Sequence, residues 1–326
     1  MNINAHFVQP PAEIFVDQLI SRLDSQVRLT TGQEELAPAD TTILIAGRPT
    51  RELLAAGPMI RSLIIPWAGL PDETGRLLVE FPDITVHNLH HNAQPVAEMV
   101  LALLLGAAKL VLPFDRLLRR NDWTPRYEQS QAQLLAGKTA LILGYGSIGH
   151  LTAGHCKALG MRVLATRRRP NGDSDGPADE VYSANALHDL LPEANALLIC
   201  LPHTSETDGL IGQKELALLR EKSILVNVGR GPIVDQEALY LALQSRHLHA
   251  AGLDVWYNYP TDSASRKQTS PADFPFRELD NIIMSPHRAG STAESNALRM
   301  AHLADLLNAA AAGEEMPNRV NLAAGY

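Results

Sequence analysis

The sequence predicts an α/β protein of two domains, with a doubly wound parallel sheet inserted into a smaller parallel α/β layer. A short apolar run at residues 139–143 leads into a three-glycine turn, and helical spacing follows at residues 150–159. Short apolar runs alternate with helical patterns along most of the chain, as in repeated βαβ units. The 326 residues also exceed what one hydrophobic core usually holds.

The first part of the chain predicts the smaller layer. A helical pattern covers residues 12–23, and short apolar runs at residues 42–46, 63–66 and 84–87 predict parallel strands. A single long helix is expected over residues 95–118. Because this helix is apolar nearly all round, we expect it to be buried on several sides, as a bridge between domains or as part of a subunit interface.

The larger domain follows this helix. We therefore expect a dinucleotide-binding domain at residues 98–291, between the two parts of a substrate domain at residues 1–97 and 292–326. A loop is expected at residues 170–178, which are rich in glycine, proline and aspartate. The other expected elements are strands at 161–165, 180–183, 196–201, 223–228, 250–254 and 281–285, and helices at 184–191, 213–219, 236–245 and 292–312.

Composition excludes several classes of protein. With 45% apolar and 20% charged residues the chain is typical of a globular protein, and its net charge of -8 argues against a nucleic-acid-binding surface. The longest apolar run, residues 99–108, is too short to span a bilayer, and no signal peptide is visible, so we expect a cytoplasmic protein without a membrane partner. Two cysteines form no disulfide framework, and His87, His90 and His91 lack metal-ligand spacing, so no metal is expected.

The three-glycine turn predicts the cofactor site. Gly144, Gly146 and Gly149 allow a tight turn and close backbone approach to a pyrophosphate, and the helix that follows offers its N-terminal N–H groups to the phosphates. The intervening Tyr145, Ser147 and Ile148 are expected to line the same turn. The alternative is a strand–helix turn that binds no ligand.

Three polar residues stand at the carboxyl ends of predicted strands, where ligands bind in such sheets. Arg230 suits a carboxylate or carbonyl oxygen, and His287 can exchange the proton that moves with a hydride. Asp254 ends the strand between them. Each has a structural alternative, namely a surface arginine, a capping aspartate and a loop histidine, but their joint placement after a dinucleotide turn favours catalysis.

Four segments together resemble the D-isomer-specific 2-hydroxyacid dehydrogenase family over about residues 60–310. They are GYGSIG at 144–149, NVGRGPIVD at 227–235, GLDVW at 252–256 and SPHRAG at 285–290. The resemblance implies a Rossmann nucleotide domain inserted into a flavodoxin-like substrate domain, a nicotinamide cofactor and a homodimer. It also implies that Arg230 holds the substrate carboxylate and polarises the carbonyl, that His287 is the acid/base, and that Asp254 lies near the nicotinamide.

The resemblance implies further contacts. Ala68 and Gly69 look like the turn whose backbone binds the substrate carboxylate, and Asn92 resembles a substrate-contacting asparagine of the formate branch. A helix N-cap is an equally good interpretation of Asn92. Further cofactor contacts are expected at Leu201, Pro202, Val228 and Gly229.

The sequence departs from the family at Tyr259, where most members have a glutamate that pairs with the histidine and the formate branch has glutamine. A carboxylate raises the pKa of a neighbouring histidine, whereas a neutral phenol adds little charge, so we expect His287 to titrate below its family counterparts. A carboxylate from Asp262, Glu278 or Asp280 is the alternative.

The second departure concerns the choice of cofactor. Arg167 occupies the place of the family's acidic residue for the ribose, between Thr166 and Arg168-Arg169. A guanidinium attracts a 2′-phosphate that a carboxylate would repel, so we expect NADP, with NAD as the alternative if this is only a solvated basic loop.

Three functions stay open at this stage. The favoured one is NADPH-dependent reduction of a small 2-keto acid such as glyoxylate or hydroxypyruvate. Formate-like oxidation is disfavoured, because Tyr259 replaces the amide of that branch. A low-turnover regulatory protein that responds to the dinucleotide is the third, disfavoured by the presence of both Arg230 and His287.

Overall fold

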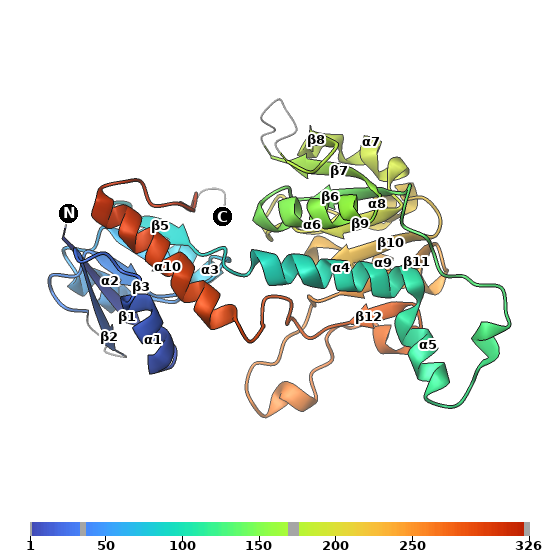
Figure 1. Cartoon of the computed structure of the whole chain (residues 1–326), viewed down its shortest axis with the longest axis horizontal. Coiled ribbons are helices and arrows are strands. Elements are labelled where there is room, and N and C mark those ends of the chain that lie inside the picture. The colour runs from blue at the N-terminus through green and yellow to red at the C-terminus, as the bar shows by residue number, and fades with distance from the viewer. Residues whose placement is uncertain (1, 33–36, 169–175, 323–326) are drawn as a thin grey trace. The chain divides into compact units, whose positions relative to one another are not determined.

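The computed structural model describes residues 2–32, 37–168 and 176–322. The chain forms two compact units, the first made of Met1–Asn92 with Ser291–Tyr326 and the second of Ala93–Gly290 (Figure 1). We call them unit 1 and unit 2. The expected boundaries, at 97/98 and 291/292, lie slightly C-terminal to these. Most of the loop expected at 170–178 lies outside the described residues.

Unit 1 is built on a parallel five-stranded sheet in the order β2-β1-β3-β4-β5, the flavodoxin-like order. Two of its strands do not stand out in the sequence. β1 contains the buried His6, whose Nδ1 lies 2.9 Å from Thr30 Oγ1, and β2 is a half-exposed edge strand with a polar arginine and two threonines. The strands are β1 Ile3–Val8, β2 Val27–Gly32, β3 Ile43–Ile45, β4 Ser62–Ile65 and β5 Thr85–Asn88.

Helices cover both faces of this sheet because alternate strand residues point to opposite sides. Ile43 and Ile45 of β3 pack in one cluster with α1 and α10, whereas Leu44 packs in another with α2 and α3. Thr50 caps α2 by accepting a hydrogen bond from the N–H of Leu53, at 3.2 Å. The helices are α1 Glu13–Ile20, α2 Arg51–Ala56, α3 Asp72–Leu78 and α10 Ser295–Ala312.

Unit 2 contains a parallel seven-stranded sheet in the order β12-β11-β10-β9-β6-β7-β8. The chain starts at β6 and builds first toward β8 and then toward β12, so the order reverses between β6 and β9. This is the doubly wound sheet that the sequence predicts, and the reversal marks where a ligand binds. The strands are β6 Thr139–Leu143, β7 Arg162–Arg167, β8 Glu180–Ser183, β9 Ala196–Ile199, β10 Ser223–Asn227, β11 Leu248–Leu253 and β12 Ile282–Met284.

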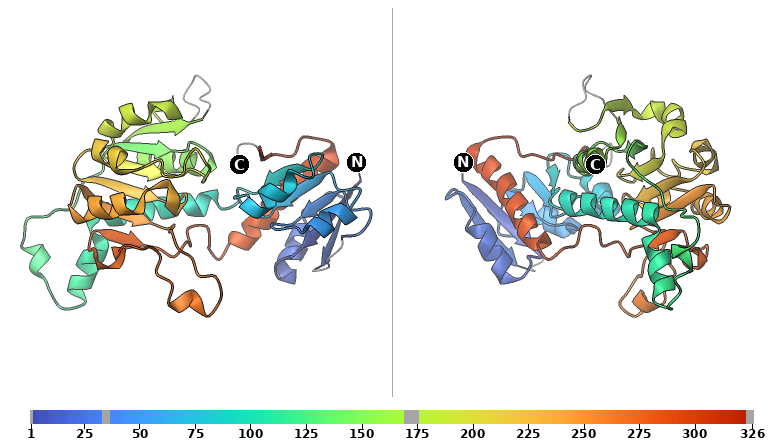
Figure 2. Two further views of the ribbon diagram at one scale, coloured as in Figure 1. Left: turned by 180° about the vertical axis from the view of Figure 1, so that it is seen from behind. Right: turned by 45° about the vertical axis from the view of Figure 1, so that its right-hand side comes forward.

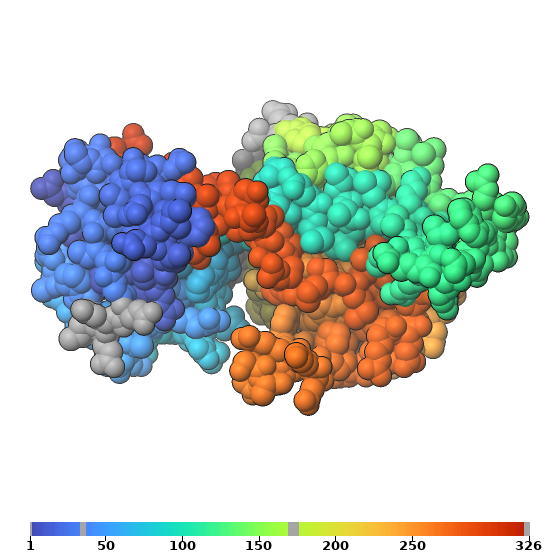
Figure 3. Space-filling view, turned by 60° about the horizontal axis from the view of Figure 1, so that its bottom comes forward, coloured from blue at the N-terminus to red at the C-terminus, as the bar shows by residue number. Residues whose placement is uncertain are grey.

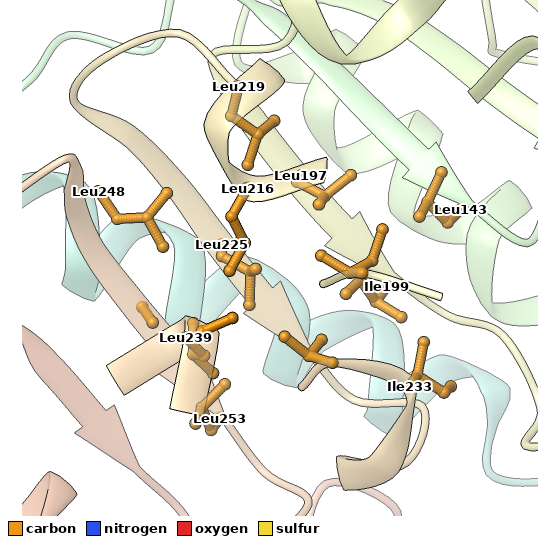
Figure 4. Packing of buried hydrophobic residues seen from close by; sticks show 14 of the residues in the cluster. Leu143, Leu197, Ile199, Leu216, Leu219, Leu225, Ile233, Leu239, Leu248 and Leu253 are labelled. Carbon is orange, nitrogen blue, oxygen red and sulfur yellow. The ribbon is translucent and has the colours of Figure 1, made fainter. Parts of the chain in front are cut away.

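The two faces of this sheet have different packing. One presents large side chains such as Leu143, Leu197 and Leu225 to Leu216 and Leu239 of the helices that cover it (Figure 4). The other presents smaller residues to α4 and α6, including alanines at 140, 196 and 250. The helices of unit 2 are α4 Ala93–Lys109, α5 Val111–Leu118, α6 Ser147–Ala158, α7 Leu187–Leu190, α8 Gln213–Leu218 and α9 Gln236–Gln244. Short 3-10 turns are η1 Thr124–Arg126, η2 Ala184–Ala186, η3 Leu191–Glu193, η4 Gly231–Ile233, η5 Ser265–Lys267 and η6 Phe276–Glu278.

The single helix expected over residues 95–118 is wrong. It breaks at Leu110, whose φ of 54° is left-handed, and α4 and α5 meet at a bend of 63°. The first half has the expected burial, since α4 packs on β10, β11 and α6 in the centre of unit 2 (Figure 2). Among the described residues no single helix is long and apolar enough to cross a membrane, and only this bent pair passes that test jointly.

Close packing of α4 on the sheet depends on Gly252, because a Cβ there would lie 2.7 Å from the Cβ of Leu103. We expect Gly252→Ala to lower the free energy of unfolding by about 1–3 kcal/mol through overpacking. Gly154→Ala in α6 is the control, since its Cβ would meet nothing closer than 3.9 Å and alanine favours a helix. Urea unfolding followed by circular dichroism measures both, and equal stability of the two variants would contradict this account.

Candidate active site

Each of the three glycines in the turn before and at the start of α6 suits its position for a different structural reason. Gly144 has a φ of 95°, and its N–H donates to the carbonyl of Thr166 at 3.2 Å. Gly149 lies so close to β6 that a Cβ would be 2.1 Å from the carbonyl oxygen of Gly144. Gly146, the N-cap of α6, has open space where its Cβ would be. The turn is therefore tight, packed on its inner side and open at the helix N-terminus, as a dinucleotide pyrophosphate requires.

The side chain of Tyr145 packs into unit 2 and does not face this open space. It is 5% exposed, and its hydroxyl accepts the N–H of Ala178 at 3.1 Å. Its backbone N–H donates to Thr166 at 2.9 Å. Ser147 begins α6 and Ile148 is half-buried beside the core. We conclude that Tyr145 holds the turn through its backbone and its buried ring.

The end of β7 lies against this turn, because the carbonyl of Thr166 accepts the N–H groups of both Gly144 and Tyr145. Thr166 is buried, and Arg167, the last residue of β7, comes next. Arg168 is exposed and pairs with Glu206 at 2.7 Å. Arg169 lies outside the described residues. Since Glu206 offsets the charge of Arg168, Arg167 is the better candidate for binding a 2′-phosphate.

The loops that follow β9 and β10 meet at the same edge of the sheet. A Cβ on Gly229 would lie 2.5 Å from the carbonyl oxygen of Leu201, which precedes Pro202. The N–H of Val228 donates to Ile199 at 3.2 Å. These expected cofactor residues thus lie together, at neighbouring strand ends beside the point where the strand order reverses.

Arg230 is placed by a small hydrogen-bonded turn after β10. The buried Asn227 donates from its side-chain amide to the carbonyl of Arg230 at 2.9 Å, and accepts the N–H of Gly229 at 3.0 Å. The guanidinium of Arg230 is exposed and donates to the carbonyl of Gly229 at 2.7 Å. Asn227 is a positioning residue that the sequence analysis did not identify. A polar residue at the end of a buried strand, shortly before the arginine, is the sequence feature that could have indicated this role.

Asp254 has a role that the sequence did not reveal. Its carboxylate is buried and accepts hydrogen bonds from the hydroxyl of Ser285 and from the N–H groups of Arg288 and Ala289, the latter two at 2.9 Å. These three donors surround His287, whose φ of 57° is unusual for a residue other than glycine. Asp254 therefore fixes the turn that carries the histidine.

The electrostatics of His287 follow from this placement. Partial burial lowers its pKa below the ordinary histidine value, the positive charge of Arg230 lowers it further, and the negative charge of Asp254 acts in the opposite direction. The two charged groups are thus close enough to influence the imidazole. His287 itself is exposed at the strand-end edge of unit 2.

Tyr259 contacts His287 through its ring, with the two ring centroids 5.5 Å apart. Its hydroxyl accepts the N–H of Trp256 at 3.1 Å. Burial raises the pKa of the phenol, so Tyr259 is neutral at pH 7. It packs against the histidine and adds no negative charge.

The alternative carboxylates take no part in this arrangement. Asp262 accepts the N–H of Ser265 at 2.8 Å, and Asp280 pairs with Arg246 at 2.6 Å. Glu278 is exposed in η6 and is not among the groups that shift the pKa of His287. The carboxylate that acts on His287 is that of Asp254.

The expected substrate residues belong to unit 1. The carbonyl of Ala68 accepts the side-chain amide of Asn88 at 2.6 Å, which ties the turn containing Gly69 to the end of β5. The side-chain oxygen of Asn92 is buried and has no hydrogen-bond partner within the described chain. An N-cap asparagine would accept a helix N–H through this oxygen, so the structure argues against the capping interpretation. Within the described residues no three His, Cys, Asp or Glu side chains form a metal site.

Comparison with known proteins identifies the family. A model of the D-isomer specific 2-hydroxyacid dehydrogenase NAD binding domain matches residues 101–289. D-3-phosphoglycerate dehydrogenase of Mycobacterium leprae is 33% identical over 281 residues, which are 84% of this chain but 49% of the relative. This chain thus spans about half the length of that enzyme. Glyoxylate/hydroxypyruvate reductase B of Pectobacterium carotovorum is 31% identical over 316 residues, 94% of this chain and 95% of the relative.

A solved structure has the same fold. The D-isomer specific 2-hydroxyacid dehydrogenase of Xanthobacter autotrophicus, in complex with NADPH and MES, superposes with a TM-score of 0.80 at 24% identity, covering 100% of both chains.

The contact between Tyr259 and His287 yields a test. Tyr259→Glu places a carboxylate beside the imidazole and should raise the pKa of His287 by about one unit, because a nearby negative charge stabilises imidazolium. Imidazolium is lost as pH rises through the pKa. For any reaction that consumes this proton, the pH above which the rate falls should therefore move to a higher value together with the pKa. Titration of the His287 ring by NMR measures the shift. Tyr259→Phe, which adds no charge, is the control, and no difference between the two variants would overturn this account.

Proposed function

The chain belongs to the D-isomer specific 2-hydroxyacid dehydrogenase family, and we propose that it reduces a small 2-keto acid such as glyoxylate or hydroxypyruvate with NADPH. The observation that carries this proposal is the placement of Arg230 after β10 and His287 after β12, at the edge of the sheet where the strands end and where the glycine turn after β6 also lies. Among relatives, a chain of nearly the same length is named a glyoxylate/hydroxypyruvate reductase. Formate-like oxidation gains no support, because Tyr259 supplies no amide, and the low-turnover regulatory alternative does not account for the coupled arginine and histidine.

The residues around the glycine turn fit a phosphorylated dinucleotide. The space beside Gly146 and the N-terminus of α6 suit a pyrophosphate, and Arg167 suits a 2′-phosphate. NAD is the alternative, without the phosphate contact. Bound here, the nicotinamide ring supplies a hydride.

Arg230 binds the substrate and stabilises negative charge, and His287 supplies the proton. The guanidinium, always positive, holds the substrate carboxylate and stabilises the negative charge that develops on the carbonyl oxygen during reduction. The protonated His287 donates its proton to that oxygen while the hydride adds to the carbonyl carbon, giving the 2-hydroxy acid. His287 is left as neutral imidazole and regains a proton from water. The backbone of Ala68 and Gly69 and the side chain of Asn92 are the proposed substrate contacts on unit 1.

We propose a homodimer formed through the segment that contains α5 and η1. This segment stands out from the rest of unit 2 (Figure 3). It exposes large hydrophobic side chains, with Tyr127 81% and Trp123 59% accessible. Apolar groups collected on an exposed surface are typical of an interaction site. The other exposed large hydrophobic residues in and near this segment are Val111, Phe114, Leu118 and Leu134.

We propose that the protein acts in the cytoplasm. Cys156 and Cys200 are free thiols, which suits a reducing compartment.

The activity is tested by following oxidation of NADPH at the nicotinamide absorbance with glyoxylate, hydroxypyruvate and pyruvate. We expect turnover with at least one of them and a loss of about 10²- to 10⁴-fold in kcat for His287→Ala, which removes the general acid. His188→Ala is the control, since this exposed histidine pairs with Glu215 at 2.8 Å on another part of unit 2. Absence of turnover with every keto acid would refute the proposed function.

The choice of cofactor is tested at the end of β7. Arg167→Asp should reduce the preference for NADPH over NADH by about 10- to 100-fold, because a charge-assisted hydrogen bond to the 2′-phosphate is replaced by repulsion. Arg277→Asp makes the same charge change at an exposed position before β12, at the opposite edge of the sheet, and should leave the preference unchanged. Ratios of kcat/KM for the two cofactors provide the measurement, and an unchanged ratio in Arg167→Asp would rule out this residue.

A further inference from the structure

Unit 2 contains a cavity that the proposed reaction does not use. It has a volume of about 680 Å³, and its lining includes Lys222, directly before β10, Leu248, the first residue of β11, and Asn281, directly before β12. These strands are neighbours, so the cavity lies at the amino-terminal edge of the sheet, opposite the candidate active site. We call it the amino-edge cavity. Its volume lies within the range of roughly 300–1,000 Å³ that is typical of small-molecule sites.

The backbone around this cavity is unusual. Leu110, Lys222 and Arg246 line it, and their φ angles of 54°, 62° and 63° are all left-handed. They are three of the six residues other than glycine that have this conformation within residues 2–32, 37–168 and 176–322. Left-handed backbone is costly for a residue with a side chain and is concentrated at functional sites. At two of these three positions the side chain is positively charged.

Basic side chains gather around the amino-edge cavity. Lys109 and Lys138 both donate from their ammonium groups to oxygens of Gln133, which lines the cavity. The side-chain amide of Gln133 donates to the carbonyl of Lys222 at 2.7 Å. The ammonium group of Lys222 in turn donates to the carbonyl of Arg246 at 3.0 Å. Four positively charged residues are thus connected through neutral groups.

Little negative charge offsets these residues, although the chain as a whole has a net charge of -8. Asp280 pairs with Arg246 at 2.6 Å, and both side chains are exposed. The three lysines donate to carbonyl and amide oxygens, and within the described residues none of them forms an ion pair. The amino-edge cavity therefore has an excess of positive charge, which a bound anion would offset through charge-assisted hydrogen bonds.

Two residues that line the cavity have polar atoms without a partner. Asn281 is 3% exposed, and its side-chain nitrogen donates to the carbonyl of Leu243 at 3.1 Å, but its side-chain oxygen has no hydrogen-bond partner among the described residues. The buried Nε2 of His249 lacks a partner in the same way. Buried polar atoms are normally hydrogen-bonded, so these two point to a ligand. A protonated His249 suits an anion, and the oxygen of Asn281 needs a donor such as a hydroxyl group.

The electrostatics of His249 agree with this arrangement. Burial lowers its pKa, the positive charges of Lys138 and Lys222 lower it further, and hydrogen bonds to backbone carbonyls near the end of α4 act in the opposite direction. The pKa of Lys138 is also lowered, by burial and by the charge of Lys109. Because an anion in the cavity would stabilise imidazolium, His249 is a local probe for it.

We propose that the amino-edge cavity binds a small hydroxylated anion, whose charged groups are carboxylates or phosphates. Lys222 and Arg246 bind the negative charge, and Asn281 accepts the hydroxyl group. This ligand is neither the substrate nor the cofactor of the proposed reaction, since the residues proposed to bind and act on those in unit 2 lie at the carboxyl ends of the strands. The inference does not depend on the proposed function.

Calorimetric titration with L-malate and with glycerol 3-phosphate tests the site. Both probes are hydroxylated dianions, and the one that binds more tightly identifies the charged group as carboxylate or phosphate. We expect a Kd of about 1 mM or lower for that probe. Lys222→Gly should weaken its binding by about 10-fold, because one charge-assisted contact is lost. Glycine suits the left-handed backbone at this position, so the variant should fold.

Lys214→Gln is the matched control. It also removes one positive charge from unit 2, at an exposed position in the first turn of α8, and should leave binding unchanged. Thermal unfolding of each variant identifies a loss of binding that comes from misfolding. Absence of binding to the wild-type protein would overturn the inference, and so would equal binding by the wild-type and Lys222→Gly proteins.

NMR titration of the His249 ring shows where the probe binds. The resonance is identified by its loss in His249→Gln. The bound probe should raise the pKa of His249 by about one unit, because an anion stabilises imidazolium, and Lys222→Gly should raise this pKa without any probe, because it removes a positive charge. A probe that binds without changing the pKa of His249 occupies another site, and that result would refute the assignment to the amino-edge cavity.

Discussion

The buried carboxylate of Asp254 is the interaction on which the candidate active site depends. It joins the end of β11 to the turn after β12 through the hydroxyl of Ser285 and two backbone N–H groups. A buried carboxylate without such donors would be costly, and here each donor comes from the segment that carries His287. The indole of Trp256 reinforces this connection by donating to the carbonyl of Ser285 at 2.8 Å. The left-handed backbone of His287 is stable because these bonds fix the residues on both sides of it.

The elements that the sequence predicts well are the ones buried on both faces. β6, β9 and β10 are continuous apolar runs, and the glycine turn after β6 leaves few alternatives to a doubly wound sheet. The missed strands are different, because β1 and β2 lie at or next to an edge of the sheet and carry polar residues. The break at Leu110 could not be predicted from that residue, because leucine rarely adopts the left-handed conformation. Pro113, in the first turn of α5, is the sequence feature that indicates the start of a new helix.

The residue types of the candidate site could be predicted, but their local roles depend on contacts between segments far apart in the chain. The sequence places Arg230 and His287 at strand ends, whereas only the fold shows that Asn227 and Asp254 hold them. The sequence shows that Tyr259 departs from the family pattern. It does not show where the hydroxyl points, and in the structure this hydroxyl accepts the N–H of Trp256.

The absence of a carboxylate at Tyr259 has a consequence for the direction of catalysis. Partial burial and the charge of Arg230 both favour the neutral imidazole of His287, and among the described residues the charge of Asp254 favours imidazolium. A lower pKa makes the protonated ring a stronger acid toward a developing alkoxide, but leaves fewer molecules protonated near neutral pH. Reduction needs the proton on the ring, and oxidation of a hydroxy acid needs it absent. For the proposed reaction, we therefore expect a phenol in place of the family's glutamate to shift reduction toward acidic conditions, and to leave the neutral ring ready to act as a base for the reverse reaction near pH 7.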